Sequence, residues 1–281
     1  MAKKNVISKK KKEFWLWTFT KTCFGLLWEI IKLPYYLVKG AHWLAPKINR
    51  TIERKVERKR VGKKRKMQHA TYDDFNVIQS SKGSIAAWEQ KMIEGESTIG
   101  IVLGARGSGK TAFGVRVLEN VYAKTKRSVC AMGFAEESMP SWINIVKNVE
   151  EIPNDSFVLI DEGGILFNAR DSMSNTNKLL SDLILISRHK NLSILFISQN
   201  SANLEINILR QADYLVLKKS ALLQREFERK IIQKLYEQTS EEFERLKDKR
   251  GLTYIHSSEF VGFISNDLPS FWKSEISKSF R

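Results

Sequence analysis

The fold of this chain is decided by one stretch of eight residues, Gly104-Ala105-Arg106-Gly107-Ser108-Gly109-Lys110-Thr111. It has the pattern G-x-x-x-x-G-K-[ST] and lies between an apolar run over 98–103 and a helical pattern over 112–122. A strand, a glycine-rich turn and a helix in this order form a loop whose backbone N–H groups surround a phosphate. We expect Lys110 to reach the β- and γ-phosphates and Thr111 to ligate Mg²⁺. All eight residues are therefore predicted to bind a nucleoside triphosphate, ATP, together with Mg²⁺.

The charge of the chain is concentrated at one end. The 281 residues include 47 Lys or Arg and 31 Asp or Glu, which gives a net charge of +16. Residues 1–66 hold 20 of the basic and four of the acidic residues, so this segment carries the whole imbalance and the remainder is neutral. A basic segment of this kind attracts polyanions, either nucleic acid or anionic lipid.

Within the basic segment, residues 14–46 form an apolar stretch that holds four of the seven tryptophans. Charges interrupt this stretch, so no uncharged run reaches the roughly 18–20 residues that a membrane-spanning helix requires. On a helix, Lys21, Lys32 and Lys39 would project within about 20° of one another and leave an apolar face. We therefore expect a basic, Trp-rich helical arm that lies in a membrane interface on anionic lipid. The alternatives are a short tilted span and an arm packed on a neighbouring subunit. Residues 50–66 fit a solvated charged helix and a nucleic-acid tether equally well.

Beyond the arm at 1–66, the sequence predicts a linker and one domain. Residues 67–92 are polar and mixed, which is typical of a linker, and 93–281 alternate β-rich runs with helical patterns. Continuously apolar runs are typical of parallel strands buried on both faces. The predicted fold class is α/β, a P-loop NTPase core with a mainly parallel, doubly wound sheet and its ligand at the carboxyl ends of the strands. Strands are expected at 98–103, 127–132, 156–161, 193–198 and 213–218, helices at 110–123, 139–148, 175–188, 204–211 and 221–248, and a final strand or hairpin at 252–264.

Two adjacent carboxylates, Asp161 and Glu162, follow an apolar run and lie 50 residues after Thr111. In a phosphate-loop site the first carboxylate joins the Mg²⁺ shell, and the second polarises the water that attacks the γ-phosphate. Such a pair also occurs at helix starts, where acids suit the helix dipole, but its distance from the loop favours catalysis. We expect Asp161 to be a metal ligand beside Thr111, and Glu162 to be catalytic together with Lys110. Glu directly after Asp favours hydrolysis that drives a motor.

Two residues near the next apolar run are further candidate catalytic groups. Gln199 ends the run over 193–198, where its amide can hydrogen-bond the attacking water, although it also suits a strand-ending turn. Arg188 follows a predicted helix, from which it can reach across a subunit boundary and stabilise the charge of the transition state. A basic residue at a helix end also complements the dipole, and Arg170 and Arg210 are alternatives for the same role.

Two sets of residues carry a resemblance to known families. The stretch RHKNLSILFISQ over 188–199, followed by LRQAD over 209–213, resembles the FtsK–HerA superfamily of DNA-pumping ATPases. The zonula occludens toxin-like branch, which includes filamentous-phage assembly ATPases, is similar in a second set, namely Asp161-Glu162, Phe167, Arg170 and Arg188-His189. The resemblance covers about residues 95–220 and does not extend to the first 92 residues.

The resemblance implies a homo-oligomer, a hexameric ring that hydrolyses ATP to move DNA through its pore. The DNA-orienting module of cell-division motors is absent, and the short core resembles viral genome-packaging or virion-extrusion ATPases. Together with the arm, this predicts a membrane-associated motor at the cytoplasmic face of a host cell or at a virion vertex. Its expected partners are DNA, membrane lipids through residues 1–66, and capsid, portal or membrane proteins. The alternatives are a virion assembly or extrusion ATPase that handles mainly protein, and an ATP-binding protein whose hydrolysis is incidental.

Overall fold

The computed structural model describes residues 62, 65, 68–94, 97–163, 173–204, 206–273 and 276. The chain divides into two units, Met1–Val61 and Gly62–Arg281, and the described residues all belong to the second. The predicted arm therefore lies outside the described residues, apart from Gly62 and Arg65. Within the described ranges, no helix has the length and apolar composition needed to cross a bilayer.

A mixed sheet of nine strands organises the described part of the chain, in the order β1-β9-β8-β7-β2-β6-β5-β3-β4. The six strands from β7 to β4 in this order pair in parallel, and β8, β9 and β1 extend the sheet in antiparallel pairs. This arrangement confirms the predicted mainly parallel α/β core. The strands are β1 (Asn76–Gly83), β2 (Ile99–Leu103), β3 (Val129–Met132), β4 (Ile143–Ile145), β5 (Phe157–Asp161), β6 (Ser193–Ile197), β7 (Tyr214–Leu217), β8 (Thr253–Ser257) and β9 (Phe260–Ser265).

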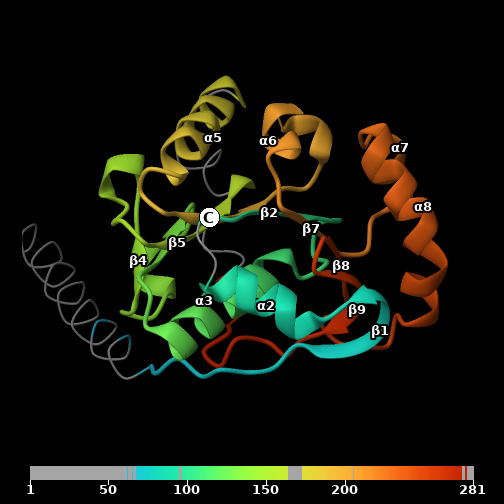
Figure 1. Ribbon diagram of the computed structural model, residues 1–281, viewed down its shortest axis with the longest axis horizontal. Helices are drawn as coiled ribbons and strands as arrows, with labels where there is room; N and C mark the ends of the chain where they lie inside the picture. The colour runs from blue at the N-terminus through green and yellow to red at the C-terminus, as the bar shows by residue number, and fades with distance from the viewer. Residues whose placement is uncertain are drawn as a thin grey trace, which may run out of the picture. The chain divides into compact units, whose positions relative to one another are not determined.

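Helices cover both faces of this sheet, as Figure 1 shows. One layer contains α2 and α3, and the opposite layer contains α5, α6 and α8, whose buried side chains belong to a second apolar cluster. Short 3-10 turns connect some of the strands. The helices are α2 (Ile85–Glu94), α3 (Lys110–Thr125), α5 (Met173–Ser187), α6 (Ile206–Arg210), α7 (Leu222–Glu226) and α8 (Lys230–Arg245), and the turns are η1 (Glu136–Ser138), η2 (Val149–Glu151) and η3 (Ser201–Asn203).

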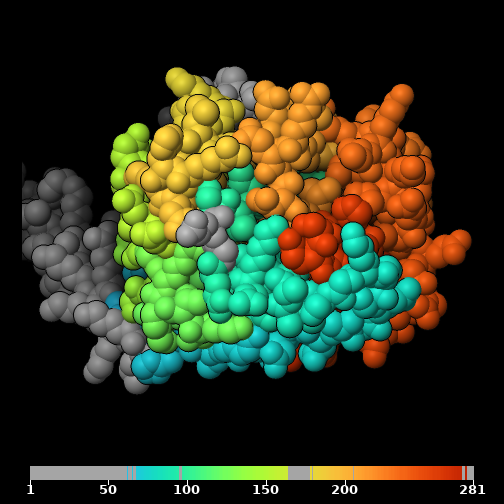
Figure 2. Space-filling model, in the orientation of Figure 1, coloured from blue at the N-terminus to red at the C-terminus, as the bar shows by residue number. Residues whose placement is uncertain are grey.

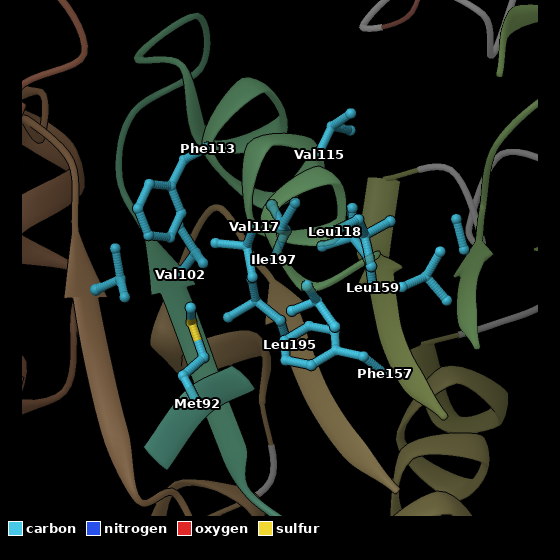
Figure 3. Packing of buried hydrophobic residues seen from close by; sticks show 14 of the residues in the cluster. Met92, Val102, Phe113, Val115, Val117, Leu118, Phe157, Leu159, Leu195 and Ile197 are labelled. Carbon is cyan, nitrogen blue, oxygen red and sulfur yellow. The ribbon is translucent and has the colours of Figure 1, made fainter. Parts of the chain in front are cut away.

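The central strands are buried on both faces, which explains their continuously apolar sequences. Along β5, Leu159 packs in the layer of α3, whereas its neighbours Val158 and Ile160 pack in the opposite layer. Successive strand residues point to opposite faces, so an apolar residue is required at every position. Figure 3 shows Phe113 and Leu118 of α3 directed toward the strands on the first face.

The helix α3 is buried on its outer side as well, because the chain entering the domain runs along it (blue in Figures 1 and 2). The Asp73 N–H donates to Asn120 Oδ1 over 3.1 Å, and Asn120 Nδ2 donates to the Asp73 carbonyl over 2.7 Å. The Thr71 N–H donates to Glu119 over 3.1 Å, and Glu119 also forms an ion pair with Arg116 at 3.0 Å. The entry segment is thus hydrogen-bonded directly to the helix that begins at the phosphate loop.

The five predicted strands are confirmed as β2, β3, β5, β6 and β7, but the prediction of a helix at 139–148 is wrong. That segment contains β4 between two 3-10 turns. In β4, Ile143 is buried and Asn144 is exposed, which is the alternation of an edge strand paired with β3. Trp142 stacks on Tyr122 of α3 with ring centroids 5.0 Å apart. The tertiary contacts of this tryptophan fix an extended segment that local propensity does not reveal.

Two other expectations change in detail. The polar segment 67–92 was expected to be a linker, but it contains β1 and most of α2, and Trp88 and Met92 of that helix are 1% exposed. The single helix expected at 221–248 is instead divided into α7 and α8 by a break at 227–229. The hairpin formed by β8 and β9 agrees with the strand or hairpin expected at 252–264.

Candidate functional site

The stretch 104–111 forms a loop between the end of β2 and the start of α3, as the motif predicts. Three of its glycines have positive φ, 149° at Gly104, 77° at Gly107 and 90° at Gly109, a backbone conformation that side chains disfavour. Gly104 is also confined by its neighbour, because a Cβ there would lie 2.7 Å from the Cβ of Lys218. The glycines therefore permit the path of a phosphate-binding loop, and the core is that of a P-loop NTPase.

Lys110 is buried at the first turn of α3 and points back over this loop. Its Nζ donates to the carbonyl of Gly104 over 2.7 Å and to the carbonyl of Ala105 over 2.9 Å. Burial lowers the pKa of the Lys110 ammonium, while the negative charges of Asp161 and Glu162 oppose that shift. The ammonium is therefore held at the mouth of the loop, where phosphate oxygens could replace the two carbonyls as acceptors.

The side chains of Thr111 and Asp161 are in contact at the carboxyl ends of the strands, although 50 residues separate them in sequence. The Thr111 hydroxyl donates to Asp161 Oδ2 over 3.1 Å, and Asp161 Oδ1 accepts the Gly163 N–H over 3.1 Å. A hydroxyl and a carboxylate are hard oxygen donors, which Mg²⁺ prefers, and Mg²⁺ sites in nucleotide enzymes often use few protein ligands besides phosphate and water. These two residues therefore fit the Mg²⁺ predicted from the sequence.

Glu162 follows Asp161 directly and is 6% exposed. Its Oε2 accepts a hydrogen bond from the Ser198 hydroxyl over 2.5 Å, and the Gln199 backbone and the Asn203 side chain lower the pKa of the carboxyl. Burial is the main factor that raises the pKa of this carboxyl, and the hydrogen bond from Ser198 opposes the shift. A carboxylate of raised basicity beside the Mg²⁺ ligands is suited to accept a proton from water.

The position of β6 brings Gln199 to the same edge. Because β6 lies between β2 and β5 in the sheet, its carboxyl end lies beside the strand that enters the P-loop and the strand that ends in Asp161. Gln199 is exposed, and its backbone carbonyl accepts a hydrogen bond from the side chain of Gln224 in α7. Gln199 thus lies at the strand ends that also carry the P-loop and the two carboxylates, and its contact with the γ-phosphate or the attacking water stays a prediction.

The candidate arginines do not join this group within one chain. Arg188 is exposed in the turn before β6, and Arg210 is exposed at the end of α6 before β7. The amino ends of parallel strands lie at the opposite sheet edge from their carboxyl ends. Both arginines therefore lie at the far edge from the P-loop of their own chain, and Arg170 lies outside the described residues.

Several residues around the site were missed by sequence reasoning. Lys218 is 1% exposed beneath the loop, and its Nζ donates to the Gly251 carbonyl over 3.0 Å and to Thr253 Oγ1 over 2.5 Å. Its backbone N–H donates to the Leu103 carbonyl over 2.8 Å, so it anchors the end of β2. The position of Lys218 directly after an apolar run could have indicated that it lies near the P-loop. Ser198, which contacts Glu162, was also overlooked although it precedes the predicted Gln199.

Comparison with known proteins agrees with the resemblance seen in the sequence. The family model described as Zonular occludens toxin (Zot) matches residues 114–221, which is less than half of the chain. This match confirms the similarity to that branch, and its range includes Asp161, Glu162 and Gln199 but begins after the P-loop. No curated protein matches the chain.

Similar solved structures include B204, the DNA-packaging ATPase from Sulfolobus Turreted Icosahedral Virus. It has 16% identity and a TM-score of 0.42, and the alignment covers 61% of this chain and 98% of that chain. The genome packaging NTPase B204 from Sulfolobus turreted icosahedral virus 2 in complex with ATP-gammaS has 14% identity, a TM-score of 0.42 and the same coverage, 61% and 98%. A KaiC-like protein from Pyrococcus horikoshii OT3 has 14% identity and a TM-score of 0.34, with 52% and 82% covered.

Proposed function

We propose that this chain hydrolyses ATP and uses the energy to move DNA, as a membrane-associated motor in viral genome packaging or in plasmid or virus DNA transfer. One observation carries the hydrolytic part of this proposal. At a single sheet edge, the Thr111 hydroxyl lies 3.1 Å from Asp161, Lys110 is held over the loop, and Glu162 is buried beside them. Binding, charge stabilisation and proton acceptance are therefore available around one γ-phosphate position.

Each of these residues would have a separate task. The loop backbone and Lys110 would bind the β- and γ-phosphates and fix their orientation. Thr111 and Asp161 would hold Mg²⁺, which when bound supplies positive charge to the phosphate oxygens. Glu162 would accept the proton of the water that attacks in line, and Gln199 would orient that water.

The DNA part of the proposal rests on the resemblance, and it is tested by the effect of DNA on hydrolysis. We expect duplex or single-stranded DNA to raise the ATPase rate of the purified chain, because a motor couples turnover to its track. The measurement is steady-state ATP hydrolysis with and without DNA, with heparin as a control for charge alone. A rate that neither DNA form changes, while Lys110-dependent hydrolysis persists, would contradict DNA movement and leave the ATPase intact.

The Zot match supports a second candidate function, a virion assembly or extrusion ATPase that acts at a membrane. The match covers residues 114–221 and so includes both carboxylates and the β6 strand end. For this function we expect lipid vesicles or coat protein to stimulate hydrolysis, and DNA to have no effect. The same assay, run with each of the three additions, therefore separates the two candidates.

We also propose that the active form is a homo-oligomer, a hexameric ring in which Arg188 acts on the nucleotide of the neighbouring subunit. Its exposure at the edge opposite the P-loop of its own chain leaves it accessible to a second copy. Arg188→Ala should lower the turnover rate by roughly 10³-fold and leave ATP affinity nearly unchanged, because a trans arginine acts on transition-state charge.

Mixing two inactive variants tests whether the sites are shared. Rings that combine Arg188→Ala subunits with Lys110→Ala subunits should recover part of the activity, since some interfaces then hold an intact loop opposite an intact arginine. Arg210→Ala is mixed with Lys110→Ala in the same way, because Arg210 is the alternative arginine and is exposed at the same sheet edge. No recovery in rings shown to be mixed would remove Arg188 from this role.

A further inference from the structure

Ser198 is the residue that connects the strand beside the P-loop to the proposed general base. It lies just after β6 and is 1% exposed. Its backbone N–H donates to the Val102 carbonyl of β2 over 3.0 Å, and its hydroxyl lies 2.5 Å from Glu162 Oε2. The Asn200 N–H and carbonyl lie 3.3 Å and 3.0 Å from Ser198 Oγ, so the shorter contact, with the carboxylate, takes the single hydroxyl proton. Ser198 therefore links the P-loop strand to Glu162 within two hydrogen bonds.

The Glu162 carboxylate receives its donors from one short segment. The Ser198 hydroxyl donates to its Oε2, and the Gln199 backbone and the Asn203 side chain, from the same segment 198–204, help to lower the pKa of this carboxyl. An ionised carboxylate has about four lone-pair sites. The hydrogen bond from Ser198 would therefore fix the direction of the carboxylate and leave lone pairs for a water molecule.

The segment 198–204 is itself held in place by α7 and by the break between α7 and α8. Glu228 is 5% exposed and accepts the Ser201 N–H over 2.7 Å as well as the Ser201 hydroxyl. Arg229 Nε donates to the Ser201 carbonyl over 3.0 Å, and Gln224 donates to the Gln199 carbonyl. The segment that contacts Glu162 is therefore held in turn by hydrogen bonds from α7 and from the break before α8.

From these contacts we infer that Ser198 is a positioning residue for hydrolysis, which aligns the Glu162 carboxylate with the attacking water. The inference rests on the proposed function, because it concerns the same site. Ser198 contacts Glu162 rather than the P-loop backbone that would bind phosphate. Its removal should therefore affect the chemical step and leave the binding of ATP unchanged.

The test compares two serine-to-alanine variants on one strand. Ser198→Ala should lower kcat by roughly 10- to 100-fold, the range expected for a misplaced catalytic group, with the Kd for ATP within about twofold of the wild type. Ser193→Ala removes a hydroxyl that is equally buried at the other end of β6, where it contacts Arg127. This control should change neither kcat nor Kd. Ser198→Thr keeps the hydroxyl and should restore most of the rate.

A double-mutant cycle with Glu162→Gln shows whether Ser198 acts through that carboxylate, and single-turnover assays make slow rates measurable. In the Glu162→Gln background, Ser198→Ala should cause little further loss. An equal loss in both backgrounds, a parallel rise in the Kd for ATP, or an unchanged or faster kcat in Ser198→Ala would overturn the inference. If the wild type shows no Lys110-dependent hydrolysis, both the proposed function and this inference are overturned. If the wild type hydrolyses ATP but Ser198→Ala does not behave as expected, only this inference is overturned.

Discussion

Lys110→Ala is expected to abolish ATP hydrolysis and to remove most ATP binding, whereas Glu162→Gln is expected to bind ATP and fail to turn it over. Lys110 is the buried cation over the P-loop, with Nζ 2.7 Å from the Gly104 carbonyl, so its loss leaves the β- and γ-phosphates without their main positive charge. Glu162→Gln keeps the size of the side chain but cannot accept a proton. Losses of about 1,000-fold or more in kcat are expected for both variants.

The two variants are separated by measuring hydrolysis and nucleotide affinity on the same preparations. Lys178→Ala and Glu237→Gln are suitable controls, because each removes the same charge from an exposed position on a helix. Both controls should behave like the wild type. Wild-type hydrolysis by Lys110→Ala, or loss of ATP binding in Glu162→Gln, would show that the nucleotide or the base has been assigned to the wrong residues.

Most residues of the candidate site could be predicted, because the patterns that indicate them are local in the sequence. The spacing of glycines and lysine over 104–111 specifies a loop, and an apolar run specifies each buried strand. Asp161 and Gln199 could be placed at the same edge because parallel strands end together. Arg188 could have been placed by the same rule, since a residue before a parallel strand lies at the opposite edge.

The rest depended on contacts between distant segments. The contact of Ser198 with Glu162 follows from the position of β6 beside β5, which the sequence of neither strand specifies. Glu228 resembles a solvent-exposed helix charge, but it is buried against Ser201 and coincides with the break between α7 and α8. The segment 67–92 looks polar because β1 is an edge strand, exposed at most of its positions.

The second large effect is expected from removing the arm. Deleting residues 1–61 removes 16 basic and four acidic residues and all four tryptophans of the apolar stretch, and it leaves Arg65 with its hydrogen bond to the Met139 carbonyl. The entry segment from Gln68 onward keeps its contacts with α3, so we expect the shortened chain to fold and to hydrolyse ATP. The full chain should float with anionic vesicles, and the shortened chain should stay in solution.

The size of this effect follows from the charge alone. Each basic residue near an anionic surface contributes on the order of 1 kcal/mol, so even five engaged residues strengthen vesicle binding by roughly 1,000-fold or more. Vesicles of zwitterionic lipid are the control, because they remove the electrostatic part. Equal flotation of the two chains would refute membrane binding by the arm and show that the ATPase core binds the vesicles.

Raising the salt concentration separates the possible attachments of the arm. At roughly 0.5 M salt, charges are screened within about 4 Å, so an arm held only through phosphates of nucleic acid or lipid should dissociate. An arm with tryptophans inserted at headgroup depth should remain bound, because burial of apolar surface does not weaken with salt. Replacing Trp15, Trp17, Trp28 and Trp43 by alanine should then remove the salt-resistant binding while keeping the binding at low salt. Salt-resistant flotation of that variant would show that the tryptophans do not insert, whereas tight binding of duplex DNA by the full chain but not by the shortened one would identify the arm as a nucleic-acid tether.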